Sequence, residues 1–307
     1  MSLDPDELVA DSVRRRPSMY VGGTDLGGYV TLIHGLVREL LRTGTRDLRW
    51  SRDGDADVLT FDGPPPDFGR VCGLRNGDWA YAGPGDDPTL DLCVADALSE
   101  DLRIVRDADR NAIRLRVRKT ILTETGVTAE AVRSYFRRLA HLNPGVRFTA
   151  DHGGPPRDYA SHGMIDLVRD VAAPLQLLDE PLAGDFVRDD AAIDFAFAFH
   201  SGSDDFVHSF AAHGRTPDGG THEDGLLRAI ADVRRELGVL EALGVVAALH
   251  VRSAPDLRFA GCLRSRVDTP RLFEAVRGGV RELVGRQLGR RPELRDSLAA
   301  ARPFYLR

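Results

Sequence analysis

The chain has 307 residues, which is enough for two domains of ordinary size, each with its own hydrophobic core. Its 42% hydrophobic and 29% charged content is that of a globular protein and excludes an intrinsically disordered chain. The net charge of −6 excludes binding of a polyanion by bulk electrostatics, although local basic patches remain available. Three cysteines without CxxC spacing indicate neither a disulfide framework nor a zinc site, so no metal ligands are predicted.

The amino terminus, MSLDPDELVADS, is acidic and contains no apolar run. The sequence also lacks any stretch of 18 or more apolar residues, the length that a membrane-spanning helix needs. We therefore expect a soluble protein of the cytoplasm with no membrane partner.

The first half mixes the helical and strand periodicities. The expected elements, in chain order, are helices at 6–20 and 29–41, a hairpin at 46–62, a helix at 90–98, paired strands at 103–105 and 112–118, a helix at 128–142 and a strand at 146–151. Thr128 is the expected N-cap of its helix. A Gly-Gly-Pro-Pro stretch at 153–156 is the expected seam between two domains, 1–156 and 157–307.

The second half begins with another helix. The expected elements are a helix at 162–172, strands at 192–200 and 205–211, a helix at 222–238, a strand at 245–251 and a helix at 270–288. Thr221 is the expected N-cap of helix 222–238. Because strands and helices do not alternate strictly, the pattern indicates the α+β class.

Four segments stand out in chain order: VRRRPSMYVGGTD (13–25), DYASHGMIDLVRDV (158–171), AFAFHSGSDDFVHSFAAHGRTPDGGTH (196–222) and ALHVRSAPDLRFAGCLRSRV (248–267). Together and in this order, they resemble the ATPase region of the gyrase B subunit of type II DNA topoisomerases. The resemblance implies a GHKL-like (Bergerat) α/β sandwich over 1–156 and a transducer-type α+β domain over 157–307. It spans nearly the whole chain.

The resemblance also identifies positions where ATP chemistry is expected but its residues are missing. The family's general base, a Glu on helix 29–41, aligns with Gly35, and its magnesium-binding Asn one turn later aligns with Glu39. The Asp that reads adenine aligns with Phe61, while Asp62 is retained. Three prolines replace the flexible segment that follows, at 64–66.

The phosphate-binding elements of the family are also altered. The glycine-rich phosphate lid aligns with DDPTLD (86–91), which has three acids and no glycine, so it would repel a triphosphate. The family's QTK aligns with Cys262, Leu263 and Arg264, which keeps one positive charge and loses the glutamine. The sequence shows no EGDSA-like metal domain and no cleavage domain, so we expect neither ATP hydrolysis nor topoisomerase activity, and neither ATP nor magnesium as a cofactor.

Three hypotheses follow. In the first, the chain is a non-hydrolysing gyrase-B-like protein that binds a partner, either a second copy in a homodimer or a protein such as gyrase. In the second, the vacated nucleotide pocket binds another small molecule, as in a cyclase or isomerase. Glu39 and Asp62 would then act as catalytic acid–base groups. The ligand-binding residues of that pocket would be Arg38, Phe61, Cys262 and Arg264. In the third, ATP is still bound.

Two further patterns, a His/Asp-rich segment and an Arg-rich segment, can each be explained either by a function or by ordinary solvent exposure. The segment from His200 to Asp224 concentrates His and Asp, which could bind a metal or transfer protons, but a solvated loop is the commoner meaning. His200 and His208 are expected on wet faces. Residues 271–307 hold nine Arg and four acidic residues. This basic segment either contacts nucleic acid or forms a solvated helix face, and the sequence leaves both alternatives open.

Overall fold

The computed structural model describes residues 5–66, 88–106, 110–238, 243–260 and 264–301, with the backbone alone for 5–9 and 88–91. It divides into two compact units. The first comprises Met1–Ala140 and Gly145–Ala160, and the second comprises His141–Pro144 and Ser161–Arg307. The main division therefore lies at 160/161, a few residues after the seam expected at 156/157.

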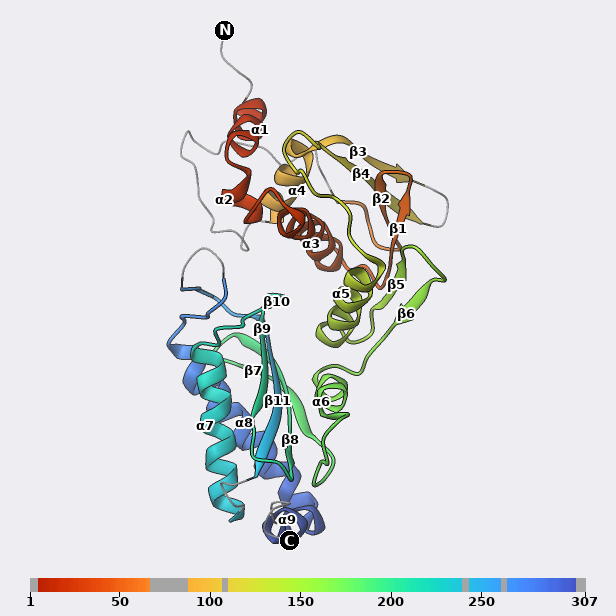
Figure 1. Cartoon of the computed structure of the whole chain (residues 1–307). Helices are drawn as coiled ribbons and strands as arrows, with labels where there is room; N and C mark the ends of the chain where they lie inside the picture. The colour runs from red at the N-terminus through yellow and green to blue at the C-terminus, as the bar shows by residue number, and fades with distance from the viewer. Residues whose placement is uncertain (1–4, 67–87, 107–109, 239–242, 261–263, 302–307) are drawn as a thin grey trace. The chain divides into compact units, whose positions relative to one another are not determined.

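The first unit is a six-stranded sheet with helices (Figure 1). Its helices are α1 (Pro5–Arg15), α2 (Pro17–Val21), α3 (Leu26–Arg42), α4 (Pro88–Ala97) and α5 (Ala129–Leu142). Its strands are β1 (Asp47–Asp53), β2 (Ala56–Phe61), β3 (Ser99–Arg106), β4 (Asn111–Val117), β5 (Arg147–Asp151) and β6 (Arg157–Tyr159). The strand order is β3-β4-β2-β1-β5-β6, and only the β1–β5 pair is parallel among these neighbours.

Along the central strands, side chains point alternately to the two faces of this sheet. Trp50 of β1, Phe61 of β2 and Phe148 of β5 are fully buried on the face that α3 and α5 cover. Trp50 packs against Phe136 of α5 with ring centroids 6.0 Å apart. Since successive strand side chains point to opposite faces, the polar residues between these aromatics lie on the other face.

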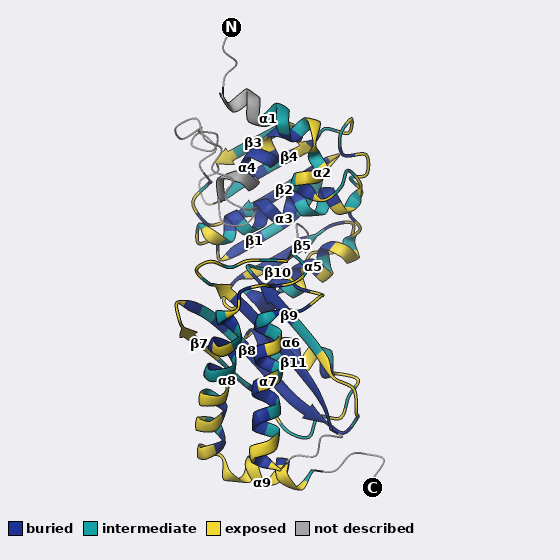
Figure 2. Ribbon diagram, turned by 90° about the vertical axis from the view of Figure 1, so that its left-hand side faces the viewer, coloured by how far each residue is buried: buried dark blue, intermediate teal, exposed yellow. Residues whose placement is uncertain are grey.

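The second unit is a five-stranded sheet between two helical layers. Its strands are β7 (Leu182–Arg188), β8 (Ala191–His200), β9 (Phe206–Ala211), β10 (Gly214–Arg215) and β11 (Gly244–Ser253), in the order β10-β9-β11-β8-β7. Its helices are α6 (Met164–Ala172), α7 (Thr221–Leu237), α8 (Arg271–Arg290) and α9 (Pro292–Ala300). The helices α7 and α8 pack with one face, and α6 contacts β8 and β11. Burial on both faces explains the nearly continuous apolar runs in β8 and β11 (Figure 2).

Most of the expected elements are confirmed within a few residues. Thr128 caps α5 as expected, because its Oγ1 accepts a hydrogen bond from the Ala131 amide at 3.2 Å. The single helix expected at 6–20 is wrong: the chain breaks at Arg16, and Pro17 starts a second helix. Thr221 is not the N-cap of α7, because Gly220 occupies that position and Thr221 Oγ1 donates to the Thr269 carbonyl instead.

Four elements were not anticipated, namely β6, β7, β10 and α9. The edge strand β7 has one buried residue, Leu182, and contains Gly184 and Asp185, so its sequence has no clear apolar alternation. Hydrogen bonding to β8 on one side holds it in the sheet. The strand conformation of β7 is therefore determined by its pairing with β8, which its own sequence does not indicate.

The segment His141–Pro144 belongs to the second unit although the chain on both sides of it belongs to the first. The buried His141 ring bonds Ser161 Oγ at 2.8 Å and the Asp170 carboxylate at 3.1 Å. Asn143 Oδ1 accepts a hydrogen bond from His213 Nε2 at 2.9 Å. These side-chain bonds fix the four-residue excursion within the second unit.

None of the helices in the described part of the chain combines the length and the apolar character needed to cross a bilayer.

Gly220 offers a test of the packing in the second unit. Its φ of 127° is unfavourable for other residues, and an added Cβ would lie 2.1 Å from the Val267 carbonyl oxygen. We expect Gly220→Ala to destabilise the second unit by at least about 2 kcal/mol in calorimetric or urea unfolding. The control is Gly285→Ala in α8, where a Cβ would meet nothing within 4 Å. It should be neutral or stabilise by up to about 1 kcal/mol. Equal effects of the two substitutions would contradict the packing described.

Candidate functional site

Helix α3 carries the positions at which the family resemblance places a general base and a metal ligand. Asp25 caps the helix by accepting a hydrogen bond from the Gly28 amide at 3.2 Å. Gly35 and Glu39 lie one turn apart and are both buried. Arg42, also on α3, donates to both oxygens of the Glu39 carboxylate, with Nε–Oε2 at 2.8 Å and Nη2–Oε1 at 2.6 Å. Glu39 is thus engaged in an ion pair within its own helix.

A neighbouring stripe of α3 faces helix α5. The imidazole of His34 stacks on the Tyr135 ring with centroids 3.7 Å apart and an angle of 12°. Burial lowers the pKa of His34 to about 3, and the nearby charges of Arg138 and Arg38 act in the same direction. The predicted ligand-binding residue Arg38 is therefore part of the environment of a neutral histidine. His34 was not predicted from the sequence; the available signal was its place one helical turn before Arg38.

The end of β2 carries the other two predicted positions of the first unit. Phe61 has no exposed surface and lies in the core beneath the helices, paired in register with Leu48. Asp62 turns the opposite way: its Oδ1 accepts hydrogen bonds from the amides of Arg46 at 2.8 Å and Asp47 at 2.9 Å. The Asp62 carboxylate thus joins the end of β2 to the beginning of β1.

The remaining predicted residues belong to the second unit. Cys262 and Leu263 lie outside the described residues. Arg264 is described, with a φ of 54°, and its guanidinium lies over the Phe259 ring at 5.4 Å from the centroid. Positive φ at a residue other than glycine is uncommon, so this backbone is held by its surroundings.

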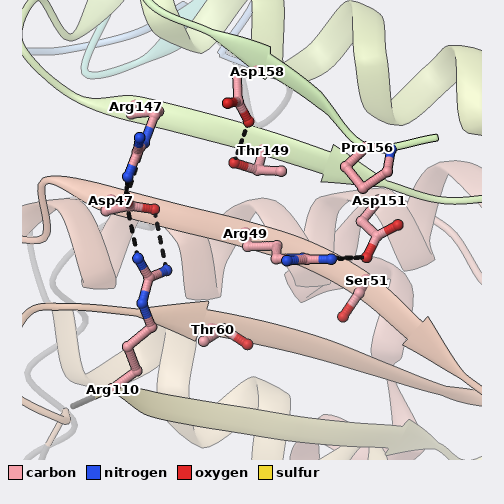
Figure 3. A pocket seen from close by; sticks show the side chains of 10 residues that line it. All are labelled: Asp47, Arg49, Ser51, Thr60, Arg110, Arg147, Thr149, Asp151, Pro156 and Asp158. Atoms are coloured by element: carbon pink, nitrogen blue, oxygen red, sulfur yellow. Dashed lines mark hydrogen bonds and ion pairs between the residues drawn. The ribbon is translucent and has the colours of Figure 1, made fainter.

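A groove of about 600 Å³ lies on the face of the first sheet opposite α3 and α5 (Figure 3). We call it the sheet groove. None of the residues predicted from the sequence lines it. Its lining is Asp47, Arg49, Ser51, Thr60, Arg110, Arg147, Thr149, Asp151, Pro156 and Asp158. The lining residues of β1, β2 and β5 alternate along each strand with apolar core residues, so the same pleat builds the groove and the core.

Arginine–aspartate contacts organise the sheet groove. Asp47 accepts from Arg147 Nε at 3.0 Å and, less tightly, from Arg110 Nη1 at 3.4 Å. Burial raises the pKa of Asp47, but the bonds from Arg147 and Arg110 outweigh burial and hold the pKa below its usual value. Arg49 Nε donates to the Asp151 carboxylate at 3.1 Å. Thr149 Oγ1 donates to Asp158 at 2.7 Å. The groove was not predicted from the sequence, although polar residues alternate with apolar ones at 47–51 and 147–151.

The His-rich segment of the second unit does not form one solvated cluster. The expectation of a wet His200 is wrong: the ring is 2% exposed, and its Nε2 donates to the Asp204 carbonyl at 2.8 Å. His222 has no exposed surface and bonds Thr216 Oγ1 at 3.1 Å. His208 is half-buried. Within the described ranges, no group of three or more His, Cys, Asp or Glu side chains is arranged to hold a metal ion.

The buried His34 predicts a pH dependence of stability. Its folded-state pKa of about 3 lies below the unfolded value of 6.5, so the unfolded chain binds more protons between these pH values. Stability should therefore fall as pH falls through this window, by at most about 1.4 kcal/mol per pH unit from this residue. His34→Phe keeps a ring against Tyr135 and removes the titration, so its unfolding free energy should depend less steeply on pH between 6 and 4. Parallel profiles for the two proteins would contradict this assignment.

Comparison with known proteins places these features in a family context. A search of protein-family models finds no match. The chain is 32% identical to the DNA gyrase B subunit of Staphylococcus epidermidis over 284 residues, which covers 74% of this chain and 44% of that protein. It is 26% identical to the DNA gyrase B subunit of Staphylococcus aureus, with 75% of this chain and 44% of that protein covered. The match therefore spans less than half the length of these curated relatives.

Solved structures show the same fold at lower identity. The B subunit of the DNA gyrase from Myxococcus xanthus superposes with a TM-score of 0.72 at 20% identity, covering 95% of this chain and 99% of that one. The 43K ATPase domain of Thermus thermophilus gyrase B, solved with an aminocoumarin, gives 0.75 at 18% identity, covering 94% and 92% of the two chains. The expected α+β class and GHKL-type fold are thus confirmed. The chain is thus similar in sequence to DNA gyrase B subunits, and it has the fold of the gyrase B ATPase region over nearly all of its length.

Proposed function

We propose that this gyrase B-like protein does not hydrolyse ATP and acts by binding another protein. The proposal rests on helix α3, where the sequence resemblance aligns the buried Gly35 and Glu39 with the family's general base and metal ligand. Glycine has no group that can take a proton from water. Loss of a general base alone typically lowers a rate by about 10²–10⁴.

The ion pair of Glu39 supports the same conclusion. Both carboxylate oxygens already accept hydrogen bonds from Arg42, and the side chain is only 5% exposed. A magnesium ion would have to displace this arginine, and the freed carboxylate would add negative charge beside the triphosphate. Removing one partner from a buried charge-assisted pair carries a free-energy cost, which opposes that rearrangement.

The adenine-reading position gives independent support. Phe61 offers no hydrogen-bond acceptor and packs in the core, and the retained Asp62 is engaged by two backbone amides. Residual ATP binding and a repurposed small-molecule pocket both need polar groups directed into the former nucleotide position. Because Glu39 and Asp62 have partners elsewhere, we favour protein binding over these two alternatives.

Two partners fit a gyrase B-like chain. One is a second copy, which would make a homodimer, and the other is a DNA gyrase, of which the curated relatives are by name a subunit. The cytoplasm, as the sequence predicts, is the compartment where we place this activity. Neither ATP nor magnesium is a cofactor in this proposal.

Nucleotide assays test the proposal directly. With magnesium and ATP, we expect phosphate release at the level of a protein-free blank, with the ATPase region of a DNA gyrase as the positive control. A non-hydrolysable ATP analogue should produce no heat in isothermal titration. Sedimentation velocity, run alone and with gyrase, should show self-association or a complex that is unchanged by nucleotide. ATP turnover, or an ATP-induced change from monomer to dimer, would overturn the proposal.

A further inference from the structure

A serine, a histidine and an aspartate form a continuous hydrogen-bonded chain in the second unit. The His141 ring contacts Ser161 Oγ through Nδ1 at 2.8 Å and the Asp170 carboxylate through Nε2 at 3.1 Å. All three residues belong to the second unit, although 20 positions separate His141 from Ser161 in the sequence. A nucleophile, a base and an acid that orients the base are the groups that acyl transfer requires, and in this order.

The Asp170 carboxylate fixes the direction of the two hydrogen bonds. Because an ionised carboxylate only accepts, Nε2 of the neutral His141 ring carries the hydrogen and donates it to Asp170. Nδ1 then has a lone pair, which accepts the hydroxyl hydrogen of Ser161. The His141 side chain is 8% exposed, so packing holds the ring in place. The neutral imidazole is therefore oriented to take a proton from Ser161.

The hydroxyl of Ser161 has two further acceptors in reach, and both are farther away than His141. The Gly163 carbonyl lies at 3.4 Å from Oγ and the Asp166 carboxylate at 3.3 Å. The same carboxylate oxygen of Asp166 already accepts from the His162 amide at 2.8 Å and from its ring at 3.1 Å. Since the bond to His141 is the shortest, His141 is the preferred acceptor of the hydroxyl proton.

The beginning of helix α6 offers hydrogen-bond donors beside Ser161 (Figure 1). The Gly163 amide donates to Ser161 Oγ at 3.0 Å, and Gly163 is the N-cap without a side-chain bond. Within the described part of the chain, the next two amides, of Met164 and Ile165, have no hydrogen-bond acceptor. Amides of a first helical turn point out of the N-terminal end and stabilise negative charge there. A tetrahedral oxyanion formed at Ser161 would develop its charge at this end.

Two features limit the substrate to small, reactive carbonyl compounds. Ser161 is half-buried and the neighbouring His162 side chain is 90% exposed, so a small molecule can reach the hydroxyl from solvent. The hydrogen bonds from His162 hold the pKa of Asp166 below its usual value although burial raises it, so this carboxylate is charged. A negative charge near Ser161 opposes an oxyanion. An ester, which has a better leaving group than an amide, therefore fits this site.

We propose that Ser161, His141 and Asp170 form a hydrolytic site for small carboxylic esters, an activity beyond the protein binding proposed above. Ser161 Oγ attacks the carbonyl carbon while His141 Nδ1 takes the hydroxyl proton, and Asp170 stabilises the imidazolium. The bond from the carbonyl carbon to the leaving oxygen breaks, and His141 returns the proton to the departing alcohol. Water, deprotonated by His141, then cleaves the acyl–serine ester, which releases the carboxylic acid and restores Ser161.

Hydrolysis of p-nitrophenyl acetate by the whole chain tests the proposal. We expect Ser161→Ala to lower kcat/KM at least about a hundredfold, because the nucleophile is lost. Asp170→Asn should lower it at least about tenfold, because an amide can hold the ring in the wrong tautomer. Ser134→Ala is the matched control: this exposed serine of α5 contacts only the Glu130 carboxylate, at 3.5 Å, and the rate should not change.

Covalent labelling of the unaltered chain gives a second measurement that does not depend on how a variant folds. Diisopropyl fluorophosphate should modify Ser161, whose Oγ displaces fluoride from phosphorus, and peptide mass spectrometry locates the adduct. The exposed Ser203 and Ser134 should stay unmodified.

Three results would overturn the proposal. They are hydrolysis no faster than the protein-free blank, hydrolysis that persists in Ser161→Ala, which would assign it to exposed imidazoles such as that of His162, and the lack of an adduct on Ser161. Neither measurement depends on ATP turnover or on a protein partner, so failure here leaves the proposed function untouched.

Discussion

The parallel register between β1 and β5 governs both faces of the first sheet. Pairing Asp47 with Arg147 places Leu48 beside Phe148 in the core and the charged residues beside each other on the open face. A slip of one residue would reverse every side chain and bury the arginines. The same pairing therefore stabilises the hydrophobic core and creates the sheet groove, so neither feature can change without the other.

In helix α3, the residues that hold the helix in the fold differ from those at which the family resemblance expects catalysis. Its packing depends on apolar residues such as Leu36 and Leu40, which are fully buried. The positions assigned to catalysis by the family resemblance contribute differently: Gly35 is buried without a side chain, and Glu39 forms an ion pair with Arg42. The residues that stabilise this helix are thus separate from the positions at which the resemblance expects catalysis, so a substitution at those positions can leave the fold intact.

Local periodicity predicted much of the fold, whereas the candidate site depended on long-range pairing. The hairpin of β1 and β2 and the helices α3 and α5 follow from apolar spacing and a capping threonine. The sheet groove was not predicted, because it joins residues about a hundred positions apart, Asp47 and Arg147, through a parallel pairing that no local signal encodes. The exposed edge strand β7 was missed because hydrogen bonds to β8, rather than its own alternation, define it.

The four-residue excursion at His141–Pro144 has a consequence for modularity. Because the backbone passes from one unit to the other three times, at 140/141, 144/145 and 160/161, neither unit is a continuous stretch of sequence. A gene fragment beginning at Ser161 would lack His141 and Asn143, and so would leave Ser161, Asp170 and His213 without these partners. A single exchange point at 160/161 would therefore separate these hydrogen-bonded partners, whereas one at 140/141 would divide the first unit instead.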